Sequence, residues 1–169
     1  MNYTFETAYT PAAMAVMARA LRKTIRARRS KRSHRFGVLV ILLGLLLMLS
    51  AEAVTFRLIL TSIAIAVILF ALIFEDRLNG YFAYKRILPG TLSSRVLFSE
   101  EGYHSETAVG TSDFRYESIL MLAEHKDYFV FIFSASHAQL YDKRTLTGGS
   151  CEEFKAFLAA RTGKEFITV

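Results

Sequence analysis

The apolar and polar residues of the chain follow different patterns in different segments, and the most pronounced is a pair of apolar runs. Phe36–Ala51 and Leu58–Phe74 are each close to the length of a membrane-spanning helix, roughly 20 residues with about 17 as the lower limit. Glu52 and Arg57 lie between them, which is typical of a tight turn. The alternative is a helical hairpin buried in a soluble protein, but the remaining chain is too small to cover two helices that are apolar on every face. We therefore predict a transmembrane hairpin over residues 36–74.

Small residues in these runs bear on how the two helices pack. Gly44 in the first run, and Ser62 and Ala66 in the second, could allow a close approach between the helices. Neither run has an ionisable residue in its middle, so the pattern indicates no carrier for an ion or proton pathway.

Residues 1–35 predict a strand followed by a basic amphipathic helix. Aromatic residues and threonine alternate with other residues over Tyr3–Tyr9, as in a short strand. Thr10 and Pro11 form a typical helix start. The helix would place an apolar stripe on one face and basic residues largely on the other, leading straight into the membrane. The stripe could pack on the protein's own domain, which we favour, or bind lipid; its members are Met14, Met17, Leu21 and Ile25.

Residues 75–90 predict a juxtamembrane helix that lies along the membrane or leaves it, ending at Pro89-Gly90. Tyrosine, lysine and arginine just past a span are suited to the headgroup layer. We expect four of these residues to be interface anchors: Tyr81, Tyr84, Lys85 and Arg86.

From residue 91 to 169 the period changes to two, which predicts short antiparallel strands in meander order. Ser150 and Glu153 fit a capping box that starts a final helix, and Gly163 fits its end. The fold class is therefore an α+β membrane protein, with a small β-domain closed by a C-terminal helix. The strand Tyr3–Tyr9 could pair with its sheet. The expected segments are strands at Arg95–Phe98, Tyr103–Thr107, Phe114–Glu124 (long or bulged), Tyr128–Phe133 and Gln139–Tyr141, and a loop at Val109–Ser112.

Charge sets the expected orientation and partner. The net charge of the 169-residue chain is +6, yet residues 1–35 contain nine of the 21 lysines and arginines and one acid. Because basic flanks stay in the cytoplasm, both termini should be cytoplasmic at the inner membrane. A basic run beside an apolar span favours anionic lipid headgroups over nucleic acid, with an acidic protein as a further possible partner. The expected contacts are Arg19, Arg22, Arg26, Arg29, Lys143 and Arg144.

Candidate chemistry is sparse. The four histidines, His34, His104, His125 and His137, lack the spacing of metal ligands. Cys151 starts a helix, which can activate a thiol, but no catalytic histidine can be assigned to it. The sequence therefore predicts a protein that is not an enzyme and needs no metal or cofactor.

Four short motifs in the β-domain carry a family resemblance. With two membrane helices after a basic stretch, the chain resembles the YcxB-like family of small bacterial membrane proteins. The resemblance implies a cytosolic domain similar to pleckstrin-homology folds and no established activity. Members often have proline before the Lys-Arg pair, where this sequence has Asp142. The matching motifs are Phe114-Arg115-Tyr116-Glu117-Ser118-Ile119, Tyr128-Phe129-Val130-Phe131, Lys143-Arg144 and Glu152-Glu153-Phe154.

The function that these features favour is a non-enzymatic binding or regulatory module tethered to the inner leaflet. Two other classes are open: an immunity protein against a secreted bacterial toxin, and an oligomeric transport or channel subunit. The sequence indicates no oligomeric state and no particular ligand.

Overall fold

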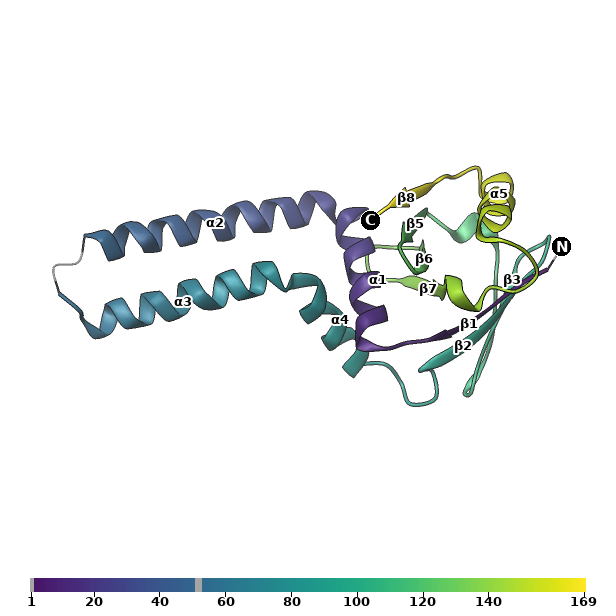
Figure 1. Cartoon of the computed structure of the whole chain (residues 1–169), viewed down its shortest axis with the longest axis horizontal. Helices are drawn as coiled ribbons and strands as arrows, with labels where there is room; N and C mark the ends of the chain where they lie inside the picture. Colours follow the sequence, from purple (N-terminus) through teal and green to yellow (C-terminus); the bar gives the residue numbers. More distant parts are fainter. Residues whose placement is uncertain (1, 51–52) are drawn as a thin grey trace.

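The structure, a computed structural model that describes residues 2–50 and 53–169, is an α+β protein with a helical hairpin and a strand-rich domain (Figure 1). Helices α2 (Ala27–Leu49) and α3 (Phe56–Ile73) form the hairpin and project from the domain. Both are long and apolar enough to cross a membrane. The predicted turn residue Glu52 lies outside the described residues, and Arg57 lies in the first turn of α3.

Glycines allow α2 and α3 to pack closely. A Cβ atom on Gly44 would lie 2.9 Å from Ile65 Cδ1, and one on Gly37 would lie 3.0 Å from Leu72 Cδ1. Ser62 also faces α2, since its hydroxyl lies 3.8 Å from Met48 Sδ. Gly44 and Ser62 therefore have the predicted packing role, whereas Ala66 is exposed.

The outer surface of the hairpin is apolar and uncovered by the domain. No residue of α3 is buried, and Leu47 and Ile63 are 67% and 55% exposed. Apart from their contact with each other, α2 and α3 therefore leave their apolar side chains exposed.

Helix α1 (Pro11–Lys23) begins as predicted, with the Thr10 side chain accepting a hydrogen bond from the Ala13 amide. It does not lead straight into the membrane, and that expectation is wrong. The Thr24 hydroxyl bonds back to the Ala20 carbonyl, and the Arg26 amide donates to the Leu21 carbonyl. These bonds close α1, so α2 starts in a new direction and α1 lies across the base of the hairpin (Figure 1).

The domain contains two four-stranded sheets. The strand orders are β1-β2-β3-β4 and β7-β6-β5-β8, all antiparallel except the parallel pair β5 and β8. The N-terminal strand pairs with β2, Tyr3 opposite Phe98, as the sequence suggested. The strands are β1 (Tyr3–Ala8), β2 (Ser93–Phe98), β3 (Tyr103–Thr107), β4 (Gly110–Phe114), β5 (Met121–His125), β6 (Tyr128–Ile132), β7 (Ala138–Asp142) and β8 (Phe166–Thr168).

Three details of the predicted strand pattern are wrong. The expected loop Val109–Ser112 is mostly β4, which pairs with β3 through a tight turn. The expected long strand Phe114–Glu124 is interrupted by a 3-10 turn at Tyr116–Ser118, where the chain crosses from one sheet to the other. Strand β8 was missed because three residues are too few to show a period.

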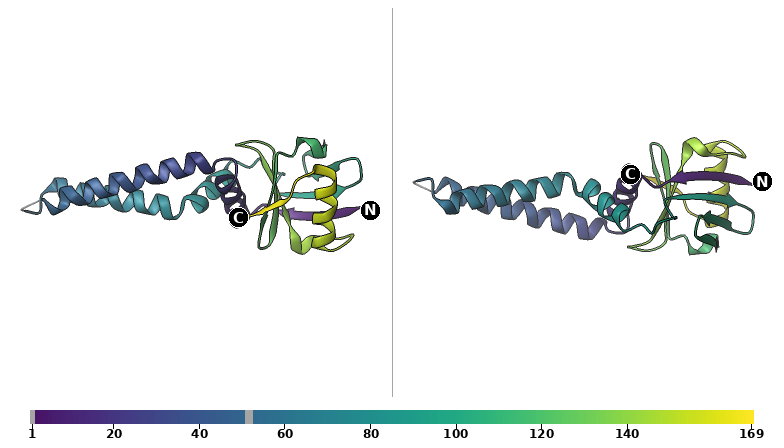
Figure 2. Two further views of the ribbon diagram at one scale, coloured as in Figure 1. Left: turned by 90° about the horizontal axis from the view of Figure 1, so that it is seen from above. Right: turned by 90° about the horizontal axis from the view of Figure 1, so that it is seen from below.

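An aromatic core joins the two sheets. The C-terminal helix α5 (Cys151–Thr162) starts with the predicted capping box and ends at Gly163 in the left-handed conformation, with φ of 65°. It lies over the end of the strands farthest from the hairpin (Figure 2). Phe154 of α5 is fully buried among Phe5, Phe98 and Phe129, with ring centroids 4.8, 5.0 and 5.5 Å away. The helix therefore closes the core, as the sequence predicted.

The second sheet is covered on both faces. Phe129 and Phe131 face the aromatic core, while Val130 and Ile132 face the apolar stripe of α1. Within that stripe, Met14 and Leu21 are both 5% exposed. The favoured interpretation of α1 is therefore confirmed for Met17 and Leu21, which pack on the protein's own domain, whereas Met14 is buried outside this cluster and Ile25 is 37% exposed.

Helix α4 (Glu75–Lys85) crosses α1 on the side away from the sheet. Gly80 is buried at the crossing, and a Cβ atom there would lie 2.5 Å from the Ala15 Cα atom. The two backbones are in contact because position 80 has no side chain. α1 is thus held between a sheet and the helix that continues from the hairpin.

We predict that Gly80→Ala lowers the stability of the protein. Alanine is the better helix former by about 1 kcal/mol, but overpacking against a backbone costs about 1–3 kcal/mol, and the clash should win. Far-UV circular dichroism during heating in detergent measures the effect. Asn79→Ala, at an exposed position of the same helix, is the control, and equal melting temperatures for both variants would contradict the close crossing.

Candidate functional site

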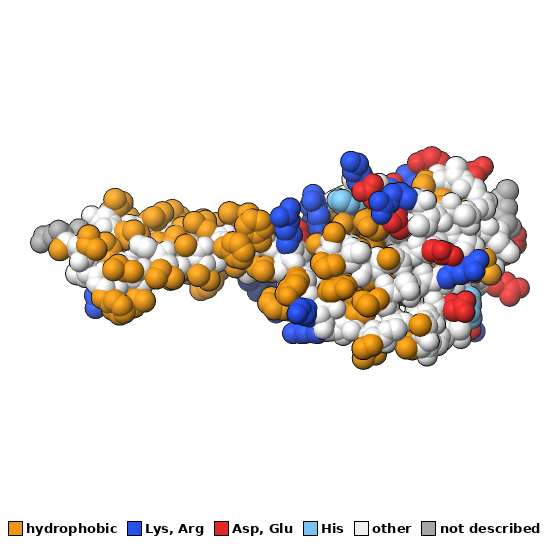
Figure 3. Space-filling model, turned by 60° about the horizontal axis from the view of Figure 1, so that its bottom comes forward, with side chains coloured by type: hydrophobic (Ala, Val, Ile, Leu, Met, Phe, Trp, Pro, Cys, Tyr) orange, Lys and Arg blue, Asp and Glu red, His pale blue; other side chains and the backbone are white. Residues whose placement is uncertain are grey.

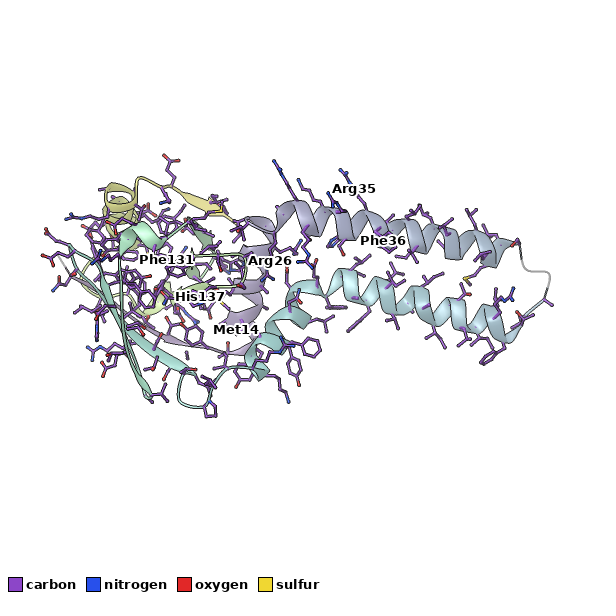
Figure 4. The ribbon with its side chains drawn as sticks, turned by 180° about the vertical axis from the view of Figure 1, so that it is seen from behind. Met14, Arg26, Arg35, Phe36, Phe131 and His137 are labelled. Atoms are coloured by element: carbon purple, nitrogen blue, oxygen red, sulfur yellow. The ribbon has the colours of Figure 1, made fainter. Side chains whose placement is uncertain are left out.

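The strongest concentration of unpaired charge lies at the base of the hairpin. Five cations occupy the first turns of α2, all exposed, and we call them the basic collar: Arg28, Arg29, Lys31, Arg32 and Arg35. Over the described ranges 2–50 and 53–169, no acid lies within 4 Å of any of them. Lys and Arg side chains gather where the hairpin meets the domain (Figure 3), and Arg35 points away from α3 (Figure 4).

The collar belongs to the same helix as the first apolar run. Helix α2 starts at Ala27, nine residues before Phe36, so the cations project from a rigid rod and not from a loose linker. Of the predicted contacts on this segment, only Arg29 lies in the collar. The other four collar residues form a visible basic run in the sequence. That they have no acidic partner among the described residues is shown only by the structure.

Arg22, a predicted contact, is committed to an ion pair within the protein. Its guanidinium donates two parallel hydrogen bonds to Asp76 at the start of α4, Nε to Oδ1 at 2.6 Å and Nη2 to Oδ2 at 2.7 Å. The hydrogen bond to Asp76 raises the pKa of Arg22. This bidentate pair fastens α1 to α4.

Arg26 and Arg19 also lie against the protein. The Arg26 Nε atom donates to the carbonyl of Ala135 in the β6–β7 loop, which also contains His137 (Figure 4). The Arg19 Nε atom is buried, and its charge bears on His125 at the end of β5. Burial and then the charge of Arg19 lower the pKa of His125.

Lys143 and Arg144 are likewise held by neighbouring acids. Lys143 bonds to Glu124, and its ammonium group lies 4.7 Å from the centre of the Phe129 ring. Arg144 makes a bidentate contact with Asp142 and is itself exposed. The hydrogen bond from Arg144 lowers the pKa of Asp142. Asp142, which replaces the proline frequent in the resembling family, therefore has a partner of its own.

Glu124 on β5 joins three elements. Its two oxygens accept hydrogen bonds from Lys143, in the 3-10 turn after β7, and from Lys155 of α5, 3.0 Å away. Burial by itself would raise the pKa of Glu124, but the two lysines outweigh it and lower the pKa. Lys143 thus has a structural partner, and its predicted lipid or protein contact stays a prediction.

The four predicted interface anchors lie at the C-terminal end of α4 and just beyond it. Tyr81, Lys85 and Arg86 are exposed, and Tyr84 is half-buried. The Lys85 ammonium lies 5.5 Å from the centre of the Tyr81 ring. The exposed Tyr81 ring and the cations Lys85 and Arg86 therefore lie together on the surface.

A polar network connects the hairpin to α4 where α3 ends. Glu75 lies 3.5 Å from His34 Nε2 and accepts a hydrogen bond from the Ser30 hydroxyl at 3.4 Å. The Arg22 Nε atom lies 3.8 Å from the same carboxylate. These contacts were not predicted, because residues 30 and 75 are brought together only by the hairpin.

A second unpredicted feature is an exposed pair on the first sheet. His104 Nδ1 lies 2.7 Å from Asp113 Oδ1 across β3 and β4, beside a shallow pocket that Arg115 also lines. Within the described ranges no three His, Cys, Asp or Glu side chains gather as a metal site would need. The collar therefore remains the strongest candidate site. Its clustered positive charges can attract anionic groups.

Comparison with known families bears on the domain. Residues 98–158 match the family described as YcxB-like protein, from the end of β2 into α5. The resemblance predicted from the short motifs is thereby confirmed for this segment, which includes all four of them. Among curated proteins, no sequence matches the chain.

We predict that Arg22→Ala destabilises the protein whereas Arg29→Ala does not. Losing a partly buried, charge-assisted bidentate contact costs about 1–2 kcal/mol, and an exposed collar residue has no partner to lose. Apparent melting temperatures in detergent measure both effects. The charge-reversed pair, Arg22→Asp with Asp76→Arg, should recover part of the loss; equal behaviour of the two single variants would rule out the structural role of Arg22.

A second prediction concerns pH. The lowered pKa of Glu124 means that its ion pairs add stability above its ordinary pKa of 4.5 and lose it as the pH falls through the lowered value. Glu124→Gln should therefore reduce the melting temperature at pH 7, and the difference from the unmodified protein should shrink in acid. Glu117→Gln, an exposed control, should change little at any pH. A difference in melting temperature that stays constant down to pH 3 would contradict the stabilising role of the ion pairs of Glu124.

Proposed function

We propose that this YcxB-like chain is a non-enzymatic membrane protein that presents its strand-rich domain as a binding or regulatory module at the bacterial inner membrane. The single observation that carries the proposal is the hairpin: two helices of spanning length whose apolar side chains no part of the domain covers. A bilayer is the environment that satisfies both the exposed apolar side chains and the internally bonded helical backbone.

The collar supports a cytoplasmic location for the domain and both termini. Its five cations flank the first span on the domain side, and Arg77, Lys85 and Arg86 flank the second. Near the described part of the turn between the helices, the basic residue is Arg57, in the first turn of α3. Basic residues beside spans are retained in the cytoplasm, so the turn faces outward and the domain faces inward.

Anionic lipid headgroups are the partner that the collar fits best. Each basic residue near an anionic surface contributes about 1 kcal/mol, and the attraction decays within a Debye length of roughly 8 Å. The collar occupies the helical turns of α2 directly before the apolar run, so its charges lie at or near the headgroup layer when the hairpin is inserted. Of the other predicted cations, Arg22 and Lys143 have partners within the protein, Asp76 and Glu124, that hold elements of the domain together.

The likeness to pleckstrin-homology folds is part of the proposal. Two largely antiparallel sheets share an aromatic core, and one C-terminal helix closes its end. This arrangement suits a module that binds a partner through its loops and edges while the core stays rigid. We place its binding role at the inner leaflet, where the hairpin would hold it.

Single-cysteine labelling tests the proposed topology. Cys151 is the only cysteine in the sequence, and Cys151→Ser provides a background without thiols. Val54→Cys, 80% exposed beside the hairpin turn, should react with a membrane-impermeant maleimide in spheroplasts. Glu152→Cys, on an 82% exposed side chain of α5, should react only after the membrane is opened. Labelling of position 152 in sealed spheroplasts, or recovery of the chain in the soluble fraction, would refute the proposal.

A further inference from the structure

A second apolar surface lies on the domain, outside the hairpin. Five large apolar or aromatic side chains are 43–71% exposed there, and we call them the loop patch: Tyr81, Phe82, Leu88, Leu92 and Val109. They come from the end of α4, the loop before β2, and the β3–β4 turn. The patch uses none of the collar residues.

Close packing brings these three segments together. Gly90 has φ of 88°, and a Cβ atom there would lie 2.5 Å from Val109 Cγ1, so the loop after α4 rests directly on the β3–β4 turn. The other end of that loop is fixed because the Tyr9 amide donates to the Leu92 carbonyl at 2.8 Å. The Tyr81 and Phe82 rings lie 5.9 Å apart. The patch is therefore a built surface and not a frayed loop.

The segments that form the patch carry only positive charges, and the acids of the adjoining groove, Glu6 and Glu106, lie beside Arg95. Residues 81–92 contain Lys85 and Arg86 and no acid, and residues 107–110 contain no charge. Aromatic rings and leucines bordered by lysine and arginine are the composition of surfaces that enter the headgroup layer of a membrane. A patch intended for a basic or neutral protein would gain nothing from these two cations.

The patch is also continuous with the hairpin. Helix α4 starts at Glu75, two residues after α3 ends, and apolar side chains extend from the hairpin onto the adjoining side of the domain (Figure 3). A bilayer that surrounds the hairpin would therefore meet α4 and, beyond it, the loop that follows α4 (Figure 1).

We propose that the loop patch is a second membrane contact, which seats the domain on the headgroup layer of the leaflet at the base of the hairpin. This inference rests on the proposed membrane location and adds to it that the domain lies against the lipid in one orientation. Leu88 and Val109 enter the interface, and Lys85 and Arg86 contact anionic headgroups. The opposite end of the domain, with the β2–β3 turn, then faces the cytoplasm and is left free for a partner.

Tryptophan fluorescence tests this seating, because the sequence contains no tryptophan. Leu88→Trp and Val109→Trp report on the patch, and Leu60→Trp, at a 51% exposed position of α3, reports on the hairpin. Leu97→Trp is the matched control, at a 42% exposed position of β2 opposite Thr4. Each variant is reconstituted into vesicles of phosphatidylethanolamine and phosphatidylglycerol, with or without bromine near the headgroup end of the acyl chains. Circular dichroism confirms that each variant is folded.

We expect brominated lipid to remove most of the emission at position 60 and a substantial part at positions 88 and 109, and to leave position 97 unchanged. If position 60 is quenched while 88 and 109 match 97, the second contact is refuted and the hairpin stands. If position 60 is not quenched, the proposed function itself fails. If emission at 88 and 109 is shifted to the blue without quenching, and the shift depends on protein density in the vesicle, a second copy covers the patch and the lipid assignment is wrong.

Discussion

The arrangement of the molecule depends on one helix being packed on two sides. α1 buries its apolar stripe on the second sheet and its opposite side on α4, where Gly80 lets two backbones meet. Since α4 follows the hairpin directly and the sheet belongs to the domain, α1 makes the two parts one body. The Arg22–Asp76 pair fixes the same crossing electrostatically. Without the packing of α1 on both sides, the hairpin would be joined to the domain by two linkers, and the orientation of the domain relative to the hairpin would be undetermined.

The cations fall into two groups because of this packing. Arg22 on α1 and Lys143 after β7 meet acids of other elements, Asp76 and Glu124, and Arg144 meets the nearby Asp142. Those on the first turns of α2 lie beyond the reach of the domain and keep their charge for the surroundings. A basic residue is therefore structural or available for binding according to which element covers it, and both kinds occur within one run of sequence.

The apolar residues divide in a similar way. In the domain, the strands bury their apolar side chains around Phe154, and α5 closes the open end of the two sheets. On the hairpin and the loop patch, comparable side chains stay exposed in the isolated chain. Burial of each exposed leucine in lipid would contribute about 1.5–3 kcal/mol. In the proposed arrangement, the hairpin, the collar and the patch form the side of the protein that faces the bilayer, and the rest of the domain faces water.

The sequence by itself determined the elements whose signals are local. Run length predicted the two long helices, Thr10, Ser150 and Gly163 predicted helix ends, and alternation predicted most strands, since each of these depends on backbone bonding within a few residues. The short motifs were also sufficient for the family resemblance. Only the tertiary structure decided that α1 turns before α2, that β8 joins β5 in parallel, and which cations stay unpaired. Contacts such as those between Arg22 and Asp76 or Gly90 and Val109 join residues far apart in the chain, and no local pattern encodes them.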